Sequence, residues 1–216
     1  MLTTGEIYHT LTRSIADFKI FNNASDFSRM KDVLKYYRFE NFPASFSKFN
    51  KLADEKIVNF QNSIKSSERF VEIIAWCLMP THIHLVVKQL KDGGISKFMS
   101  NTLNSYSRYF NIKHNRKGPL WEGRFKKILV KSDEQLLHLT RYIHLNPVTA
   151  CLVNKPEDWP ASSYKGYIGL DTAENGLCYC NIVDINPAVY KKFVEDRISY
   201  QRELAKIKHL VAEDFC

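Results

Sequence analysis

WCLMPTHIHLVV, residues 76–87, lies at the centre of an almost unbroken apolar run that begins at Phe70. The run is too rich in Val and Ile for a surface helix, and Met-Pro-Thr at residues 79–81 interrupts it. These features predict a buried β-hairpin whose turn lies at the interruption. The other predicted elements can be placed around this hairpin.

Two histidines lie in the second strand of the hairpin. Because side chains alternate between the faces of a strand, His82 and His84 point to one face with Val86, and the residues between them point into the core. Two imidazoles at this spacing can bind one metal ion from the same side. The alternative is a pair of half-exposed histidines on an open sheet face. Other parts of the sequence are needed to choose between this interpretation and a metal site.

The composition indicates a globular protein of one domain with an appendage. The 216 residues are long enough to bury a core, and 44% of them are hydrophobic, which excludes a disordered chain. The sequence has no run of membrane-spanning length and no signal-peptide pattern, so we expect a cytoplasmic protein with no membrane partner. The five cysteines are irregularly spaced and predict reduced thiols.

The net charge of +8 is concentrated in one segment. Residues 108–131 contain eight basic residues and the single acid Glu122, and aromatic residues are interleaved with them. Such a segment suits a phosphate backbone and unstacked bases, although an ordinary solvated loop and edge strand is the alternative. The candidate nucleic-acid-binding residues are Arg108, Arg116, Lys117, Trp121, Arg124, Lys126, Lys127 and Lys131.

The order of predicted elements gives the fold class. It is β-α-β-β-α-β, the split βαβ or ferredoxin-like arrangement of the α+β class. The two helices of this arrangement cover one face of the sheet, which leaves the other face open for the two histidines. The expected elements are a strand over residues 7–15, a helix over 23–39, the hairpin, a helix over 95–110 and a strand over 124–130. Residues 41–68 are interpreted as an insertion.

A further helix follows the fourth strand. Ser132 is a good cap for it, and Pro147 disfavours helical geometry at Asn146, so we expect the helix to end there. Tyr142 and Asn146 are four residues apart and share one face. An amide oxygen could be a third ligand to Mg²⁺ or Mn²⁺, beside a phenol that could attack a phosphodiester.

Periodicity alone does not identify the tyrosine. Tyr142 is one of 11 tyrosines, and Asn146 could simply end a helix. Tyr106 and Tyr109 are helical candidates as well. His138, one turn before Tyr142, could accept a proton or could be an ordinary packed or solvated histidine.

The C-terminal part of the chain carries an amphipathic pattern. Asn186-Pro187 is a good cap and first helical position for a long helix that packs on the domain or pairs two subunits as a homodimer. Its apolar stripe is Val189, Phe193, Tyr200, Leu204, Ile207 and Val211. We therefore divide the chain into a catalytic domain, residues 1–167, and a C-terminal extension, residues 168–216.

Five motifs in this order give the chain a family resemblance. They are Tyr-His at residues 8–9, MPTHIHL at 79–85, GPLWEGRF at 118–125, RYIHLNPV at 141–148, and DWP with SSY over 158–164. With these motifs, the chain resembles the single-tyrosine HUH transposases, and most closely the REP-associated tyrosine transposases. The insertion over residues 41–68 and the C-terminal helix depart from the family pattern.

The resemblance implies roles for particular residues. His82 and His84 would bind the divalent metal, Tyr142 would be the nucleophile, and Asn146 would occupy the place of the third ligand. The family implies a ferredoxin-like domain that acts on single-stranded DNA with hairpin ends and forms a 5′-phosphotyrosine beside a free 3′-hydroxyl. The alternatives are a domesticated DNA-binding protein without cleavage activity and a metal-dependent phosphodiesterase that uses water.

Overall fold

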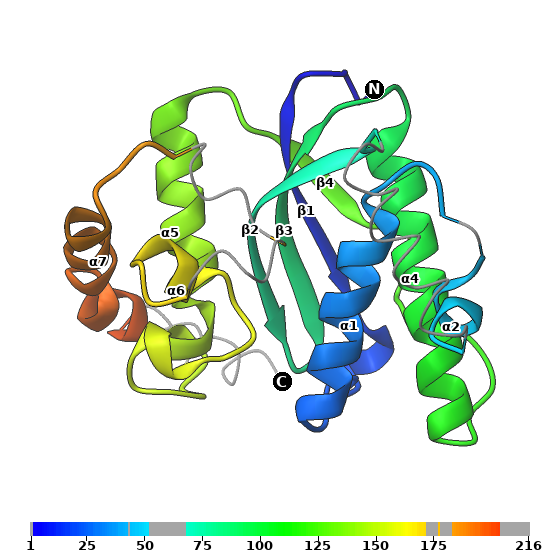
Figure 1. Cartoon of the computed structure of the whole chain (residues 1–216). Coiled ribbons are helices and arrows are strands. Elements are labelled where there is room, and N and C mark those ends of the chain that lie inside the picture. Colours follow the sequence, from blue (N-terminus) through cyan, green and yellow to red (C-terminus); the bar gives the residue numbers. More distant parts are fainter. Residues whose placement is uncertain (1, 43, 52–67, 172–176, 178–182, 204–216) are drawn as a thin grey trace.

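The computed structural model describes residues 2–42, 44–51, 68–171, 177 and 183–203. A four-stranded antiparallel sheet stands at its centre, with helices on both sides (Figure 1). Its strand order is β2-β3-β1-β4, and the order of elements along the chain confirms the predicted ferredoxin-like arrangement. The strands are β1 (Ile7–Arg13), β2 (Val71–Met79), β3 (His82–Gln89) and β4 (Lys126–Leu129).

The hairpin forms as predicted, with Pro80 and Thr81 at its turn and Met79 paired with His82. The fourth strand is shorter than expected. Predicted over residues 124–130, it pairs with β1 only over residues 126–129, and all four of its residues are exposed. The first strand is also shorter than expected. It ends at Arg13 instead of residue 15, and a short 3₁₀ helix begins at Ile15.

Helices α1 (Ala24–Tyr37) and α4 (Gly94–Lys113) cover one face of the sheet. The side chain of Asn23 caps α1 by accepting from the Asp26 backbone N–H at 3.2 Å. Gly94 lets α4 approach the hairpin closely, because a Cβ there would lie 2.5 Å from the Phe70 carbonyl oxygen. The predicted apolar face of α4 is confirmed, since Ile95, Phe98, Met99, Thr102, Leu103, Tyr106 and Phe110 are all buried.

Only part of the predicted insertion can be described. Its helix α2 (Phe46–Phe49) packs two phenylalanine rings against Tyr36 of α1. Residues 43 and 52–67 of the insertion lie outside the described residues.

The second face of the sheet is not left open, contrary to the prediction. Helix α5 (Asp133–Thr149) packs on β2, and α6 (Tyr164–Tyr167) and α7 (Pro187–Glu195) lie beside it (Figure 1). Ile74, Val86, Ile143 and Tyr164 belong to the buried cluster that forms on this side. The prediction counted only the two helices of the split βαβ unit and omitted the burial that α5 needs for its own apolar face.

Helix α5 also continues past its predicted end. It runs through Pro147 to Thr149, and Pro147 and Val148 are both buried. A proline in the last turn removes a single backbone hydrogen bond. The apolar contacts of these two buried residues compensate for it, so the conformational preference before proline did not end the helix.

Helix α7 is shorter than predicted and buries a different stripe. It ends at Glu195, and its buried residues are Tyr190 and Val194, whereas Val189 is 57% exposed and Tyr200 is 51% exposed. The predicted packing on the domain is confirmed, because Tyr190 contacts α5. Leu204, Ile207 and Val211 lie outside the described residues.

Two further observations bear on the composition. Cys77 and Cys151, the cysteines within the described part of the chain, are free thiols. Among the described helices, none combines the length and apolar character that a membrane span requires.

Candidate functional site

The pairing of β1 with β3 builds the site from the first strand and the histidine strand. Leu11 lies opposite His84, and Arg13 lies opposite His82. Residues directly opposite in an antiparallel pair share a face of the sheet, so these four side chains lie on one face. His9 lies opposite Val86 on the same face, which makes it the diagonal neighbour of His84.

The two predicted histidines lie side by side. Their ring centroids are 5.0 Å apart, and the rings are nearly perpendicular. The Nδ1 atom of His82 is 3.0 Å from the Thr81 hydroxyl, and the Nδ1 atom of His84 is 3.0 Å from the Nε2 atom of His9. Each ring therefore uses Nδ1 within the protein and leaves Nε2 for a ligand.

The environment keeps these imidazoles neutral at pH 7. The pKa of His82 is lowered to about 4, mainly by burial and to a smaller extent by the nearby Arg13 guanidinium. Burial lowers the pKa of His84 to about 2, with contributions from the neighbouring histidines and Arg13, and burial lowers the pKa of His9 to about 4. Neutral imidazole is the form that binds metals.

Tyr142, a residue of α5, contacts one of the two paired histidines. Its ring lies edge-to-face with His84 at a centroid distance of 5.8 Å and an angle of 88°. The side chain is still 45% exposed, although His84 is only 3% exposed. A phenol beside the paired imidazoles therefore remains accessible to a large substrate.

The two rival tyrosines lie elsewhere. Tyr106 is fully buried, and its hydroxyl donates to the Ile20 carbonyl at 2.6 Å. Tyr109 donates to the Asp26 carboxylate at 3.0 Å. Both belong to α4, on the opposite side of the sheet from α5 (Figure 1), so Tyr142 is the candidate that the structure brings to the histidines.

Asn146 lies on α5 one turn after Tyr142, as the spacing predicted. Its Nδ2 atom is buried and has no hydrogen-bond partner among the described residues. A buried amide N–H without a protein partner suits an acceptor such as a phosphate oxygen, and only the Oδ1 atom of this side chain could bind a cation. The described residues contain no group of three His, Cys, Asp or Glu side chains that could hold a metal, so a third ligand would come from another kind of group, for which the Asn146 amide oxygen is the candidate.

The imidazoles of His82 and His84 and the amide oxygen of Asn146 are chemically suited to bind a divalent metal. Two neutral imidazoles and one amide oxygen suit Mn²⁺ or Mg²⁺ and do not require a softer ion. His82, His84 and Asn146 are therefore the residues that could hold it.

The side chain of His138 contacts other residues of the helical side. Its Nδ1 atom lies 2.9 Å from the Arg141 guanidinium, and its ring packs edge-on against Phe193 of α7. These contacts favour the interpretation of a packed histidine over that of a proton acceptor.

Comparisons with known proteins match the segment that carries these residues. A family model described as "Transposase IS200 like" matches residues 46–146, which include His82, His84, Tyr142 and Asn146. The chain is 29% identical over 103 residues to a REP-associated tyrosine transposase of Haemophilus influenzae. Over residues 46–146 the chain is similar to the IS200-like transposases. Its predicted resemblance to the REP-associated branch is confirmed.

The match to the Haemophilus protein covers 43% of this chain and 58% of the length of that relative. A solved structure of a REP-associated tyrosine transposase bound to a REP hairpin aligns with a TM-score of 0.50 at 18% identity, over 80% of this chain and 86% of the other. A solved structure of a transposase from Deinococcus radiodurans aligns with a TM-score of 0.37 at 15% identity, over 66% of this chain and 91% of the other. At such identities the structural likeness of the first supports the fold alone.

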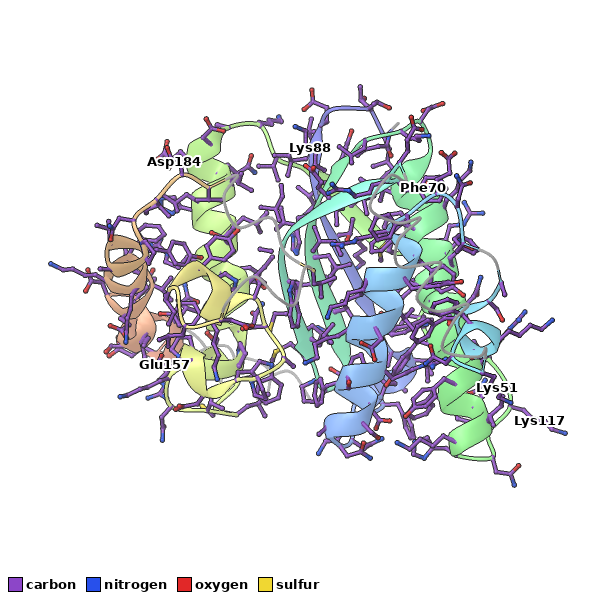
Figure 2. All side chains as sticks on the ribbon, viewed as in Figure 1. Lys51, Phe70, Lys88, Lys117, Glu157 and Asp184 are labelled. Atoms are coloured by element: carbon purple, nitrogen blue, oxygen red, sulfur yellow. The ribbon has the colours of Figure 1, made fainter. Side chains whose placement is uncertain are left out.

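The chain exposes most of its predicted nucleic-acid-binding residues. The exposed ones are Arg108, Lys117, Arg124, Lys126, Lys127 and Lys131. Lys117 projects outward beyond the end of α4 (Figure 2). Arg116 is half-buried and donates to the Asn111 side chain and the Pro119 carbonyl. Trp121 packs on the core and donates its indole N–H to the Leu103 carbonyl, so only part of its ring remains available.

The register of β4 separates two of these lysines. Lys126 lies opposite Leu11 and therefore shares the face of His84, whereas Lys127 lies opposite Thr10 and shares the other face. Lys126 also lines a cavity of about 130 Å³ with Arg13, Arg124 and Glu122. Of the predicted cations, Lys126 and Arg124 are thus the ones placed together at this cavity.

Sequence reasoning quoted His9 within the Tyr-His motif but gave it no role in the site, and it did not single out Arg13. Both lie outside the region matched by the family model. The signal that could have found them is the alternation in the first strand, because His9, Leu11 and Arg13 share a face. That signal becomes usable only when the first strand is known to pair with the histidine strand.

Proposed function

We propose that this chain is a metal-dependent transposase that cleaves and rejoins single-stranded DNA through a covalent bond to Tyr142. The observation that carries the proposal is the contact between the Tyr142 ring and the ring of His84 within one chain. The family match supports a DNA-processing role for the chain.

The metal site would consist of the Nε2 atoms of His82 and His84 and the side-chain oxygen of Asn146. When bound, Mg²⁺ or Mn²⁺ would polarise a phosphate oxygen and offset the charge that develops on it. Unperturbed phenol has a pKa near 10, so it is a weak nucleophile at neutral pH. A nearby cation would also favour the phenolate of Tyr142.

The reaction is a transesterification. The Tyr142 oxygen loses its proton to solvent and forms a bond to phosphorus, while the bond from phosphorus to the 3′ oxygen breaks. The 3′ oxygen takes up a proton and leaves as a free hydroxyl, and the downstream strand stays on Tyr142 as a 5′-phosphotyrosine. Attack by a 3′-hydroxyl on this phosphotyrosine reverses the steps and rejoins DNA.

The proposed substrate is single-stranded DNA beside a hairpin. The solved relative bound to a REP hairpin and the net charge of +8 support this choice. Arg13, Arg124 and Lys126 line one cavity, and Arg13 lies opposite His82 in the sheet, so these cations could bind the backbone of such a strand. One chain contains all the proposed catalytic groups, so the predicted homodimer is not needed for a single cleavage.

The test uses oligonucleotides that carry a hairpin and a randomised single-stranded flank, incubated with the full chain and Mn²⁺. With a 3′ label, the label should migrate with the protein on a denaturing gel, and with a 5′ label a shorter free strand should appear. EDTA should prevent both products. Tyr142→Phe should fold and bind the oligonucleotide but form no adduct, whereas Tyr109→Phe should still form it.

Each different outcome of this experiment would support one of the alternative functions or another nucleophile. Cleavage without any adduct, retained in Tyr142→Phe, would indicate a phosphodiesterase that uses water. Binding without cleavage in the wild-type chain would indicate a domesticated DNA-binding protein. An adduct that persists in Tyr142→Phe would show that another tyrosine is the nucleophile.

A further inference from the structure

His9 is a buried polar side chain that the proposed chemistry does not use. It lies on β1, is 8% exposed, and shares the sheet face of His84. Its ring is nearly parallel to that of His84, with an interplanar angle of 12° and a centroid distance of 5.3 Å. An imidazole buried on this face needs a hydrogen-bond partner, and His84 supplies one.

The contact fixes which atoms carry protons. His9 Nε2 and His84 Nδ1 are 3.0 Å apart, so one of them has to donate and the other accept. If His84 Nδ1 accepts, its remaining proton lies on Nε2, and that nitrogen cannot bind a cation. If His84 Nδ1 donates, Nε2 presents a free lone pair. The second arrangement requires His9 to carry its own proton on Nδ1.

We propose that His9 is a positioning residue, which accepts the Nδ1–H of His84 and thereby holds the Nε2 lone pair of His84 toward the metal. The inference rests on the proposed function, because it assigns His84 to a metal. Metal-binding histidines ordinarily donate their second ring N–H to a partner that fixes the tautomer and the ring orientation. Here the partner would be an imidazole from the neighbouring strand.

His9 itself is not a metal ligand in this geometry. Its Nε2 atom is occupied by His84, and no three His, Cys, Asp or Glu side chains within the described residues form a group that could hold a metal. His82 has a weaker equivalent in the hydroxyl of its own neighbour Thr81. The two ligands are thus oriented by different elements, His82 by the hairpin turn and His84 by β1.

The first experiment measures Mn²⁺ binding to the full chain by electron paramagnetic resonance of free Mn²⁺, without DNA. His9→Leu should weaken Mn²⁺ binding by about 10-fold to 100-fold, the usual effect of removing such a partner. His9→Gln, whose side-chain oxygen can accept from His84 Nδ1, should restore part of the affinity. His138→Leu is the matched control, since that histidine contacts Arg141 and Phe193, and it should bind as the wild type does.

The outcomes separate this inference from the proposed function. A wild-type chain that binds no Mn²⁺ would refute the metal site itself. Wild-type affinity in a folded His9→Leu variant would refute the role of His9 and leave the metal site intact. Equal losses in His9→Leu and His9→Gln would also refute it, because packing would then explain the effect.

A second measurement does not depend on any variant folding. Imidazole ¹⁵N chemical shifts of the metal-free wild-type protein report which ring nitrogen carries the proton. We expect protonated Nδ1 in both His9 and His84, with Nε2 of His84 unprotonated. Protonated Nε2 in both rings would reverse the hydrogen bond and overturn the proposal.

Discussion

Arg13 and His82 lie directly opposite each other across the pair of β1 and β3. The guanidinium is near enough to lower the pKa of both His82 and His84, after the larger effect of burial. Its Nη1 atom also donates to the Asp17 carboxylate at 2.9 Å, and the side chain lines the cavity beside the site. A guanidinium in this place can bind a phosphate oxygen through two N–H groups.

Arg13→Gln should therefore slow strand cleavage by roughly 100-fold to 1,000-fold, the order of effect seen when one donor to a developing charge is removed. Arg13→Lys should retain part of the activity, because it keeps the charge and loses the planar fork. Rates of adduct formation on the hairpin oligonucleotide measure the effect. Lys97→Gln, an exposed cation on α4, is the control, and an equal rate for Arg13→Gln and wild type would remove Arg13 from the site.

Lys126 and Lys127 are adjacent in sequence but lie on opposite faces of the sheet. Lys126→Gln should reduce the dependence of log affinity on log salt by about 0.7, the value for one lost phosphate contact with a single strand. Lys127→Gln should change this slope less. Titrations of single-stranded DNA at several salt concentrations give both slopes. Identical slopes for the two variants would mean that the strand does not follow the histidine face.

His144 links acid stability to the docking of α7. It is fully buried on α5, with Nδ1 2.7 Å from the Tyr190 hydroxyl and Nε2 2.8 Å from the Ser163 hydroxyl. The Ser163 hydroxyl is also 3.2 Å from the Trp76 carbonyl, to which it donates. Ser163 therefore accepts from Nε2–H, and Nδ1 accepts from Tyr190, which suits a neutral imidazole. Burial lowers the pKa of His144 to about 3.

The pH dependence follows from this lowered pKa. Between pH 6.5 and 3 the unfolded chain binds a proton at His144 that the folded chain does not, so stability should fall as the pH falls through this window. Above pH 6.5 the contribution is complete. His144→Gln should reduce the slope of unfolding free energy against pH by up to about 1.4 kcal/mol per pH unit. Urea unfolding at several pH values measures it, and an unchanged slope would contradict the assignment.

Tyr190 provides a separate test of the same helix contact. Tyr190→Phe keeps the ring but leaves the Nδ1 acceptor of His144 without this donor, which should cost about 1–3 kcal/mol of folding free energy. Tyr200→Phe is the matched control, since Tyr200 is half-exposed and should change stability little. Equal midpoints of urea unfolding for the two variants would show that the Tyr190 hydroxyl contributes nothing.

The sequence was sufficient to predict those features that depend only on residues close together in the chain. The alternation around His82 and His84, the apolar face of α4 and the spacing of Tyr142 and Asn146 depend on neighbouring residues, and the structure agrees with all three. His9 and Arg13 could not be found in this way. Their role depends on the order of strands in the sheet and on the register between β1 and β3, which no local pattern specifies.

The errors at α5 and α7 have a tertiary origin. Pro147 was expected to end α5, but burial of Pro147 and Val148 outweighs one lost hydrogen bond. Val189 was expected in the buried stripe of α7 but is exposed, whereas Tyr190 and Val194 are buried and Phe193 packs partly buried against the same cluster. His144 on α5 offers Tyr190 a hydrogen-bond partner, which no pattern within α7 itself indicates.

The placement of Tyr142 against the histidines of its own chain has a stoichiometric consequence for the proposed transposase. One phenol forms one ester, so a chain can retain only one broken strand end at any moment. A mobile DNA segment has two ends, and exchanging both at once requires two copies of the protein at the same DNA. A single copy would have to finish and release the first end before it could cut the second.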